Sequence, residues 1–283
     1  MGTPAGAKPG RLVCVGLGMM LGAHIGPRAR SQIEHADVVF VAASDPFVEL
    51  WLKHMHRDVR SLQPHYGEGK SRHQTYRGMV EAMLSEVRVG KQVCGAFYGH
   101  PGVFAQVAHD AIAQARGEGL LAHMEPGVSA EDCLYADLGI DPGRYGCQHY
   151  EASQFMFYRR RIDPAAYLVL WQVGIAGDRS CTRFATGPAL RRVLIERLIE
   201  DYPLDHEAII YEAATLPISE SRMDVVKLGD LPDALLHMHS TLVLPPATKM
   251  QPDPDMLRRI EVAERTDMAS IPVITALPLE EGV

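Results

Sequence analysis

Apolar runs alternate with amphipathic segments through the first half of the chain. The short apolar runs have the length and composition of buried strands, and the segments between them repeat apolar positions at helical spacing. Each connection runs strand–helix–strand, so we expect a mostly parallel sheet here. We predict strands at 11–15, 37–43, 92–97 and 120–125, and helices at 26–36, 71–88 and 105–116.

The second half predicts a separate α/β domain whose strands run in mixed directions. We place the boundary near Pro126, and the tail ends in an apolar run, Ile271 to Leu277. The predicted strands are 167–173, 207–213, 221–227 and 240–244, with helices at 188–201 and 228–235. The expected organisation is a disordered lead at 1–9, an N-terminal domain at 10–126, a C-terminal domain at 127–248 and a tail at 249–283.

Composition narrows the class of protein. A hydrophobic content of 47% and a charged content of 22% are normal for a globular protein, and a net charge of −7 argues against broad nucleic-acid binding. We interpret the basic stretch 158–161 as a solvated helix end. No apolar run reaches membrane-spanning length, and the N-terminus lacks a signal peptide. Five cysteines without close spacing favour reduced thiols in the cytoplasm.

Thirteen histidines raise the question of a metal site. The densest groups are His54-Met55-His56 and His237-Met238-His239. Neither belongs to an H-E-x-x-H or C-x-x-C pattern, so we expect no metal ion.

The central feature is a glycine-containing turn, Tyr98 to Phe104 (YGHPGVF), between a predicted strand and a predicted helix. Open α/β sheets bind ligands outside the carboxyl ends of their strands. Matching turns follow other strands, at Gly16-Leu17-Gly18 and at 126–128 (PGV). Ser129 and Asp132 form an approximate capping box at the next helix, an anion-friendly place. The alternative is a set of ordinary strand-to-helix turns.

These glycines do not form a dinucleotide-binding fingerprint. The third glycine of G-x-G-x-x-G is absent because position 21 is Leu, and Asp45 is a poor substitute for the acidic residue after the second strand.

A second group of polar aromatic residues precedes the central turn. Arg72 and Tyr76 are four residues apart and share a helix face, and Tyr66 on the preceding loop can reach the same place. The alternative is a surface arginine beside a half-buried tyrosine.

Together these motifs resemble the tetrapyrrole methylase superfamily of S-adenosylmethionine-dependent methyltransferases. Within it, the chain is most similar to the borosin peptide backbone α-N-methyltransferases. The motifs appear in the expected order over most of residues 11–247. They are YGHPGVF (98–104), PGVSAED (126–132), ADLG (136–139) with YGC (145–147), GKSR (69–72) with TY (75–76), QVG (172–174), YEA (211–213), and STL (240–242) with PP (245–246).

The resemblance implies a two-domain tetrapyrrole-methylase-like fold with S-adenosylmethionine in the interdomain cleft, leaving S-adenosylhomocysteine as product. It also implies a cytoplasmic homodimer with two bound peptides. The implied catalytic residues are Tyr66, Arg72, Tyr76 and Tyr98. The implied cofactor contacts are Tyr98, His100, Val103, Phe104, Ser129, Ala130, Gln172, Tyr211, Ala213, Ser240 and Thr241.

The chemistry explains these residue types. An amide nitrogen is a poor nucleophile because its lone pair is delocalised into the carbonyl. We expect Tyr76, with Tyr98, to hydrogen-bond the carbonyl oxygen as charge builds there. We expect Tyr66, made more acidic by Arg72, to help remove the N–H proton. Fused fungal members usually carry a second tyrosine where this chain has Gln63.

A further departure concerns the substrate. Fused members continue into a helical clasp and a core peptide, whereas this chain ends at residue 283, soon after Pro246. We therefore expect iterative N-methylation of a separate precursor peptide in trans. Alternatives are methylation of the tail at 271–277, a tetrapyrrole C-methyltransferase, and a non-catalytic cofactor-binding domain.

Overall fold

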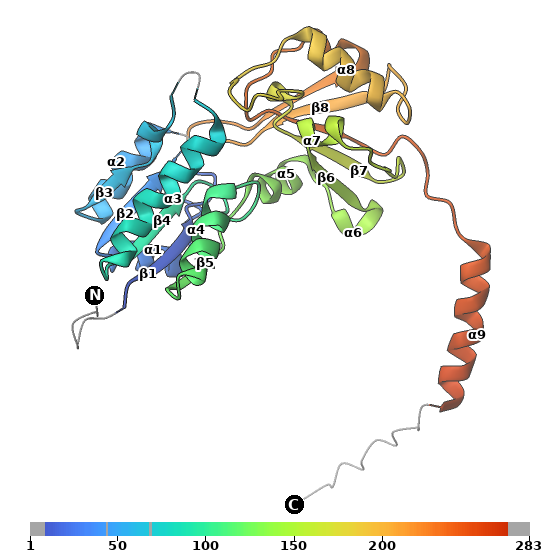
Figure 1. Ribbon diagram of the computed structural model, residues 1–283. Coiled ribbons are helices and arrows are strands. Elements are labelled where there is room, and N and C mark those ends of the chain that lie inside the picture. The colour runs from blue at the N-terminus through green and yellow to red at the C-terminus, as the bar shows by residue number, and fades with distance from the viewer. Residues whose placement is uncertain (1–8, 44, 68–69, 271–283) are drawn as a thin grey trace, which may run out of the picture. The chain divides into compact units, whose positions relative to one another are not determined.

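The structure is a computed structural model that describes residues 9–43, 45–67 and 70–270. The chain divides into two compact units, residues 1–247 and 248–283. Two sheets of five strands each make up the first unit (Figure 1). The apolar run 271–277 and nearly all of the predicted lead lie outside the described residues.

The first sheet is parallel throughout, as predicted. Its strand order is β3-β2-β4-β1-β5, so β1 and β4 are neighbours at its centre. The strands are β1 (Arg11–Gly16), β2 (Val38–Ala42), β3 (Val59–Ser61), β4 (Gln92–Phe97) and β5 (Leu121–Glu125).

Helices cover both faces of this sheet because successive strand residues point to opposite sides. Leu12 and Cys14 face a core shared with α3 and α4, whereas Val13 and Val15 face a core shared with α1 and α2. Figure 1 shows α3 and α4 crossing the same face of the sheet. The helical segments are α1 (Pro27–Glu34), α2 (Pro46–Met55), the short turn η1 (Gln63–His65), α3 (Arg72–Arg88) and α4 (Gln106–Gly117).

The second sheet is mixed, which also confirms the prediction. Its order is β6-β7-β10-β8-β9, and the β6–β7 pair is parallel while the other pairs are antiparallel. The strands are β6 (Cys147–Glu151), β7 (Tyr167–Trp171), β8 (Glu207–Glu212), β9 (Arg222–Lys227) and β10 (Thr241–Leu244).

Two apolar clusters sandwich this second sheet. Leu168 and Leu170 face α7 and α8, and Val169 and Trp171 face the side on which α5 lies. The helical segments are α5 (Ala130–Leu138), α6 (Pro142–Tyr145), α7 (Ala152–Phe157), η2 (Val173–Ile175), α8 (Pro188–Leu198) and η3 (Leu228–Asp233). The short helix predicted at 228–235 is a 3-10 helix, Leu228–Asp233, that contains Pro232.

Several short elements escaped the sequence prediction, among them α2, β3 and the segment from α6 to α7. Helix α2 directly follows Asp45, whose side chain accepts a hydrogen bond from the Phe47 amide at 2.8 Å and caps the helix. From the sequence, Asp45 was considered only as an acidic residue after the second strand. The second unit contains α9 (Pro254–Ser270), a helix that the proline-rich, charged composition of the tail did not predict. None of the described helices has the length and apolar character that a bilayer crossing requires.

Candidate functional site

Four glycines allow three turns to pack closely at the carboxyl edge of the first sheet. Gly18 and Gly99, both with positive φ, exchange backbone hydrogen bonds of 2.9 and 3.1 Å between the turns after β1 and β4. A Cβ on Gly16 would lie 2.5 Å from the Gly99 oxygen and 2.6 Å from the Gly127 Cα. The three turns are therefore packed backbone against backbone, which only glycine allows.

Two histidines hold the central turn. The Gly102 amide donates to the His100 Nδ1 at 2.9 Å, and the His109 Nε2 lies 2.9 Å from the Gly102 oxygen. The turn ends at Phe104, whose φ of 49° is in the left-handed region. Its ring centroid is 5.3 Å from that of Trp171 at the end of β7, so the turn reaches the second sheet.

Several of the remaining cofactor-binding candidates lie at one edge of the second sheet. The register pairs Thr241 with Tyr211, and the Val173 amide donates to the Ser240 oxygen at 2.9 Å. The end of β7, the end of β8 and the beginning of β10 are therefore adjacent, because β10 runs antiparallel to both neighbours. Gln172, at the same edge, adopts a left-handed conformation with φ of 58°.

The cofactor candidates divide into two groups by what their side chains already do. Ser129 caps α5 through Asp132, the Tyr211 hydroxyl donates to Asp137 at 2.8 Å, and the Ser240 hydroxyl donates to Glu212. These side chains, like that of Thr241, are buried, so these residues can offer backbone groups to a ligand. The candidates with accessible surface are Tyr98, His100, Val103, Phe104, Ala130, Gln172 and Ala213.

Three tyrosines and an arginine meet beside the central turn. Burial raises the pKa of the Tyr66 phenol, and the nearby hydroxyls of Tyr76 and Tyr98 raise it further, with a Tyr66–Tyr76 hydrogen bond contributing. Burial, and then Tyr76, also raise the pKa of Tyr98. Arg72 acts in the opposite direction but is the smallest of these causes. Arg72 thus lowers the pKa of Tyr66, in the predicted direction, but the larger causes leave that pKa raised overall.

Arg72 is fixed by a loop of the C-terminal half. Its amide donates to the Cys181 oxygen at 3.1 Å, and its Nη2 donates to the Arg183 oxygen at 2.6 Å. The loop is closed around buried Asp178, which accepts hydrogen bonds from the amides of Ser180 and Arg183. The sequence analysis missed this loop, whose only signal is a short run of small polar residues.

The Gln63 side chain is engaged with backbone at the end of β2. Its side-chain amide donates to the Ala43 oxygen, after β2. The Gln63 side chain is therefore hydrogen-bonded to the residue that follows β2. Tyr66 comes directly after η1 and has an extended backbone conformation.

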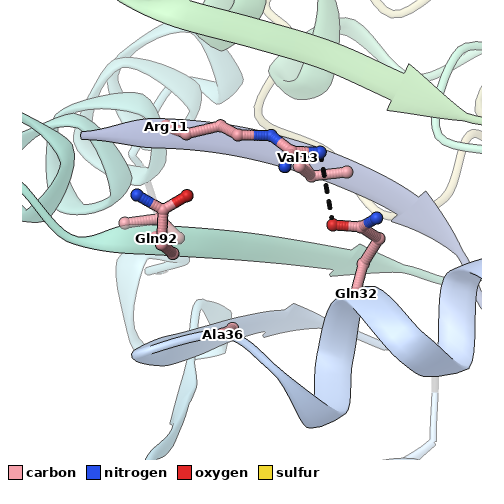
Figure 2. Close-up of a pocket in the computed structure, with 6 residues that line it drawn as sticks. Arg11, Val13, Gln32, Ala36 and Gln92 are labelled. Carbon is pink, nitrogen blue, oxygen red and sulfur yellow. Dashed lines mark hydrogen bonds between the residues drawn. The ribbon is translucent and has the colours of Figure 1, made fainter. Parts of the chain in front are cut away.

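Two small cavities lie at opposite ends of the first sheet. One, of about 10 Å³, has room for about one water and includes Gly18, Tyr98 and Thr215 in its lining. The other, of about 20 Å³, lies at the amino ends of the strands, where the Arg11 Nη2 donates to the Gln32 Oε1 at 3.4 Å (Figure 2). The glycine turns and tyrosines all belong to the carboxyl end, which is where open α/β sheets bind ligands.

Comparison with known proteins decides the family. The model of the family "Tetrapyrrole (Corrin/Porphyrin) Methylases" matches residues 11–232. The chain belongs to this family.

Curated relatives lie among the fungal borosins. The chain is 40% identical over 259 residues to a methyltransferase/ribosomally synthesized cyclic peptide gymnopeptides precursor of Gymnopus fusipes, covering 90% of this chain and 62% of that protein. It is 40% identical over 278 residues to a type I borosin cyclic peptide precursor of Coprinopsis marcescibilis, covering 94% and 71%. The chain thus spans about three fifths of the length of the first of these tetrapyrrole methylase relatives.

Solved structures support the fold. The cobalt precorrin-4 methyltransferase matches with a TM-score of 0.57 at 16% identity, over 83% of this chain and 94% of that one. The uroporphyrin-III-C-methyltransferase of Thermus thermophilus matches with a TM-score of 0.57 at 21% identity, over 84% and 93%. At these identities the likeness shows the tetrapyrrole methylase fold alone.

Proposed function

We propose that this protein is an S-adenosylmethionine-dependent methyltransferase that methylates backbone amide nitrogens of a ribosomally made peptide. The observation that supports this most directly is the group Tyr66, Arg72, Tyr76 and Tyr98 beside the central turn. Three phenols beside one guanidinium, with the pKa of Tyr66 and of Tyr98 raised, suit a substrate whose carbonyl oxygen gains charge in the transition state. The names of the borosin relatives, which join a methyltransferase to a peptide precursor, agree with this reading.

The residues at the two sheet edges fit the cofactor. S-adenosylmethionine is a cation with polar ends, and the edges offer backbone amides and carbonyls without a cluster of cations. Phe104 and Gln172 have positive φ, which turns their peptide groups away from the strands they follow. The bound cofactor would supply an electrophilic methyl group. We propose that it is held by the eleven residues named from the resemblance, with Ser129, Tyr211, Ser240 and Thr241 contributing backbone groups.

The phenols act as hydrogen-bond donors in this scheme. Methyl transfer forms an N–C bond, breaks the S–CH₃ bond with its electron pair left on sulfur, and passes the amide proton to solvent water. Because burial and neighbouring phenols raise the pKa of Tyr66, we assign Tyr66, like Tyr76 and Tyr98, to donation toward the carbonyl oxygen. Arg72, fixed by the Arg183 oxygen, is a positive charge beside these phenols and stabilises developing negative charge.

The proposed substrate is a separate precursor peptide that binds the enzyme in trans. The enzyme itself is proposed to be a homodimer. Tandem mass spectrometry tests the proposed substrate: the protein is co-expressed with peptides encoded beside its gene, and mass increments of whole methyl groups are localised. Increments on backbone nitrogens of a separate peptide support the proposal. Increments on residues 271–277 of this chain would instead show self-methylation.

A matched control separates activity from binding. The Tyr66→Phe variant lacks one hydroxyl and should bind S-adenosylhomocysteine as the parent does while methylating far more slowly. If no peptide is modified although the cofactor product binds tightly, the peptide substrate is wrong. Methylation of a carboxylate-bearing tetrapyrrole would then be the reaction to assay.

A further inference from the structure

A histidine-rich turn lies against a shielded carboxylate in the second sheet. The turn His237–Ser240 precedes β10, and the Ser240 amide donates to the His237 oxygen at 3.0 Å. Glu212, the last residue of β8, is 25 positions earlier in the chain, and only 11% of its side chain is exposed. His237 and His239 are half exposed or more, so solvent reaches the group.

The ligand atoms have the spacing of a metal site. The His237 Nδ1 is 2.9 and 3.0 Å from the two Glu212 oxygens, and the His239 Nε2 is 3.4 Å from Oε2. The three ligand atoms all lie within 4.8 Å of one another. A tetrahedral zinc ion with bonds of about 2.1 Å separates neighbouring ligand atoms by about 3.4 Å. Small side-chain rotations therefore suffice to bring the three atoms around one ion.

The surroundings hold these ligands in place. The Ser240 hydroxyl accepts from the His237 amide at 2.7 Å and itself donates to the Glu212 Oε1. A Cβ on Gly174 would lie 1.9 Å from the His237 oxygen, so the turn rests directly on the η2 backbone. The ligand-bearing backbone is thus formed in advance, which lowers the cost of ordering a site on binding.

Charge also favours a cation. Arg222 donates to the Glu212 Oε1 at 2.9 Å, but it is shared with Asp224 at 2.7 Å. These two carboxylates and one guanidinium leave one formal negative charge beside the two imidazoles. Because Arg222 and Ser240 both use Oε1, Oε2 is the oxygen that can face a metal ion.

The other His-Met-His sequence provides a contrast within the same chain. Both ring nitrogens of buried His56 lie against backbone oxygens, of Asp58 and Ala36. The His54 Nδ1 lies 2.8 Å from the Leu50 oxygen at the surface of α2. This pair therefore does not converge on an ion, although its sequence pattern is identical.

We propose that Glu212, His237 and His239 bind one divalent transition-metal ion, with Zn²⁺ preferred, and that water completes the coordination. Two imidazoles and a carboxylate are a ligand set that zinc accepts, and the solvent side leaves its fourth position open. No metal was expected from the sequence because neither His-Met-His group belongs to an H-E-x-x-H or C-x-x-C pattern; Glu212, 25 positions before His237, is brought to them by the fold. The ion would bridge the end of β8 to the start of β10. This proposal does not depend on which peptide is the substrate, but Glu212 lies between the proposed cofactor contacts Tyr211 and Ala213 and accepts a hydrogen bond from a third, Ser240.

Metal titration of the full chain without a polyhistidine tag tests the proposal. The protein is stripped with a chelator, and equilibrium dialysis against ZnCl₂ with elemental analysis measures stoichiometry and affinity. We expect one Zn²⁺ per chain and, with Co²⁺ in its place, the visible absorption of a four-coordinate site. His239→Ala should weaken binding by about tenfold or more, and His54→Ala, the matched control, should leave it unchanged.

A second variant distinguishes the site from a simple surface histidine pair. Glu212→Gln removes the charged ligand but keeps the side-chain shape, and circular dichroism reports whether it folds. Folded Glu212→Gln with wild-type affinity would overturn the proposal, as would the absence of stoichiometric zinc or an equal loss in His54→Ala. If Glu212→Gln does not fold, His237→Ala and His239→Ala decide the question, because both side chains are exposed.

Discussion

At the scale of single residues, Tyr66 gives the sharpest test of the proposed chemistry. Its pKa is raised by burial first and by Tyr76 and Tyr98 next, so the phenol is protonated at neutral pH and can donate. Tyr66→Phe removes this donor, and we expect the methylation rate to fall about 100-fold or more, as when a single oxyanion donor is lost. Single-turnover mass spectrometry measures the rate.

The control for Tyr66→Phe is the affinity for S-adenosylhomocysteine, which should be unchanged. A rate within about threefold of the parent would remove Tyr66 from the catalytic group. The pH profile adds a second readout: a donor with a raised pKa predicts no loss of activity through pH 9, whereas a Tyr66 acting as phenolate predicts activity that rises with pH.

Asp178 affects the proposed catalytic group indirectly, because it holds the loop whose Arg183 oxygen accepts a hydrogen bond from Arg72. Burial would raise the pKa of Asp178, but hydrogen bonds from Ser180 and the Arg183 amide outweigh it and lower the pKa. Asp178→Asn leaves the Arg183 amide facing an amide group, and we expect a loss of about 1–3 kcal/mol of stability at pH 7. Methylation should also slow, because the Arg183 oxygen holds Arg72.

The sign of the pH effect follows from the lowered pKa of Asp178. Its contribution is fully present above the unfolded-state pKa, near 4, and is lost as the pH falls through the lower folded-state pKa. The stability difference between parent and Asp178→Asn should therefore shrink from pH 7 toward pH 3. Urea unfolding at several pH values measures it, and a difference that grows on acidification would contradict this account.

Local residue patterns were enough to indicate the turns and helix faces of the candidate site, but not the pKa values of its side chains. The glycine turns, the Ser129–Asp132 capping box and the shared helix face of Arg72 and Tyr76 depend on local spacing, which a sequence displays. The pKa of Tyr66 depends on burial and on Tyr98, which follows a different strand. Burial and contacts between residues far apart in the chain leave no local sequence pattern, so the sequence indicated the effect of Arg72 but not the larger opposing causes.

At the scale of elements, the packed glycine turns make a prediction of their own. A methyl group on Gly16 would meet the Gly99 oxygen at 2.5 Å, where both contacting groups are backbone and cannot rotate away. We expect Gly16→Ala to destabilise the fold by about 1–3 kcal/mol through overpacking. It should also displace the central turn and weaken cofactor binding.

Gly117, at the end of α4, is the matched control for Gly16. No atom lies within 4 Å of a Cβ built there, and its φ is not positive, so Gly117→Ala should be neutral or stabilise by up to about 1 kcal/mol. Chemical denaturation measures both variants. Equal effects of the two substitutions would show that the close approach at Gly16 is relaxed in solution.

Helices and strands were predictable where the apolar pattern continued over many residues and was bounded by turn residues. Strands β1, β2, β4 and β5 of the first sheet and helices α3 and α4 fall where the apolar pattern places them, within a few residues. Most of the missed elements are short or depend on contacts from elsewhere, whereas α9, with 17 residues, lies in a charged, proline-rich tail. β3 has three residues and no fully buried side chain, and it exists because it pairs with β2.

At the scale of the whole first unit, the proposed cofactor would link its two sheets. Phe104, in the turn after β4, contacts Trp171 at the end of β7, and the Leu21 amide donates to the Thr215 oxygen at 2.9 Å. A ligand held from both edges stabilises the folded unit by mass action. At a free concentration a hundred times the dissociation constant, S-adenosylhomocysteine should add about 2.7 kcal/mol to the free energy of unfolding.

For a unit of this size, that gain corresponds to a rise in melting temperature of about 5–10 °C. Phe104→Ala should weaken S-adenosylhomocysteine binding by about threefold to tenfold, because it removes an aromatic contact between the domains. Phe47→Ala, which truncates another exposed ring, should leave the ligand-induced shift unchanged. Differential scanning calorimetry with and without ligand measures all three proteins. If the parent shows no ligand-dependent shift, the two edges do not form a cofactor site; if only Phe47→Ala loses the shift, the site lies beside α2.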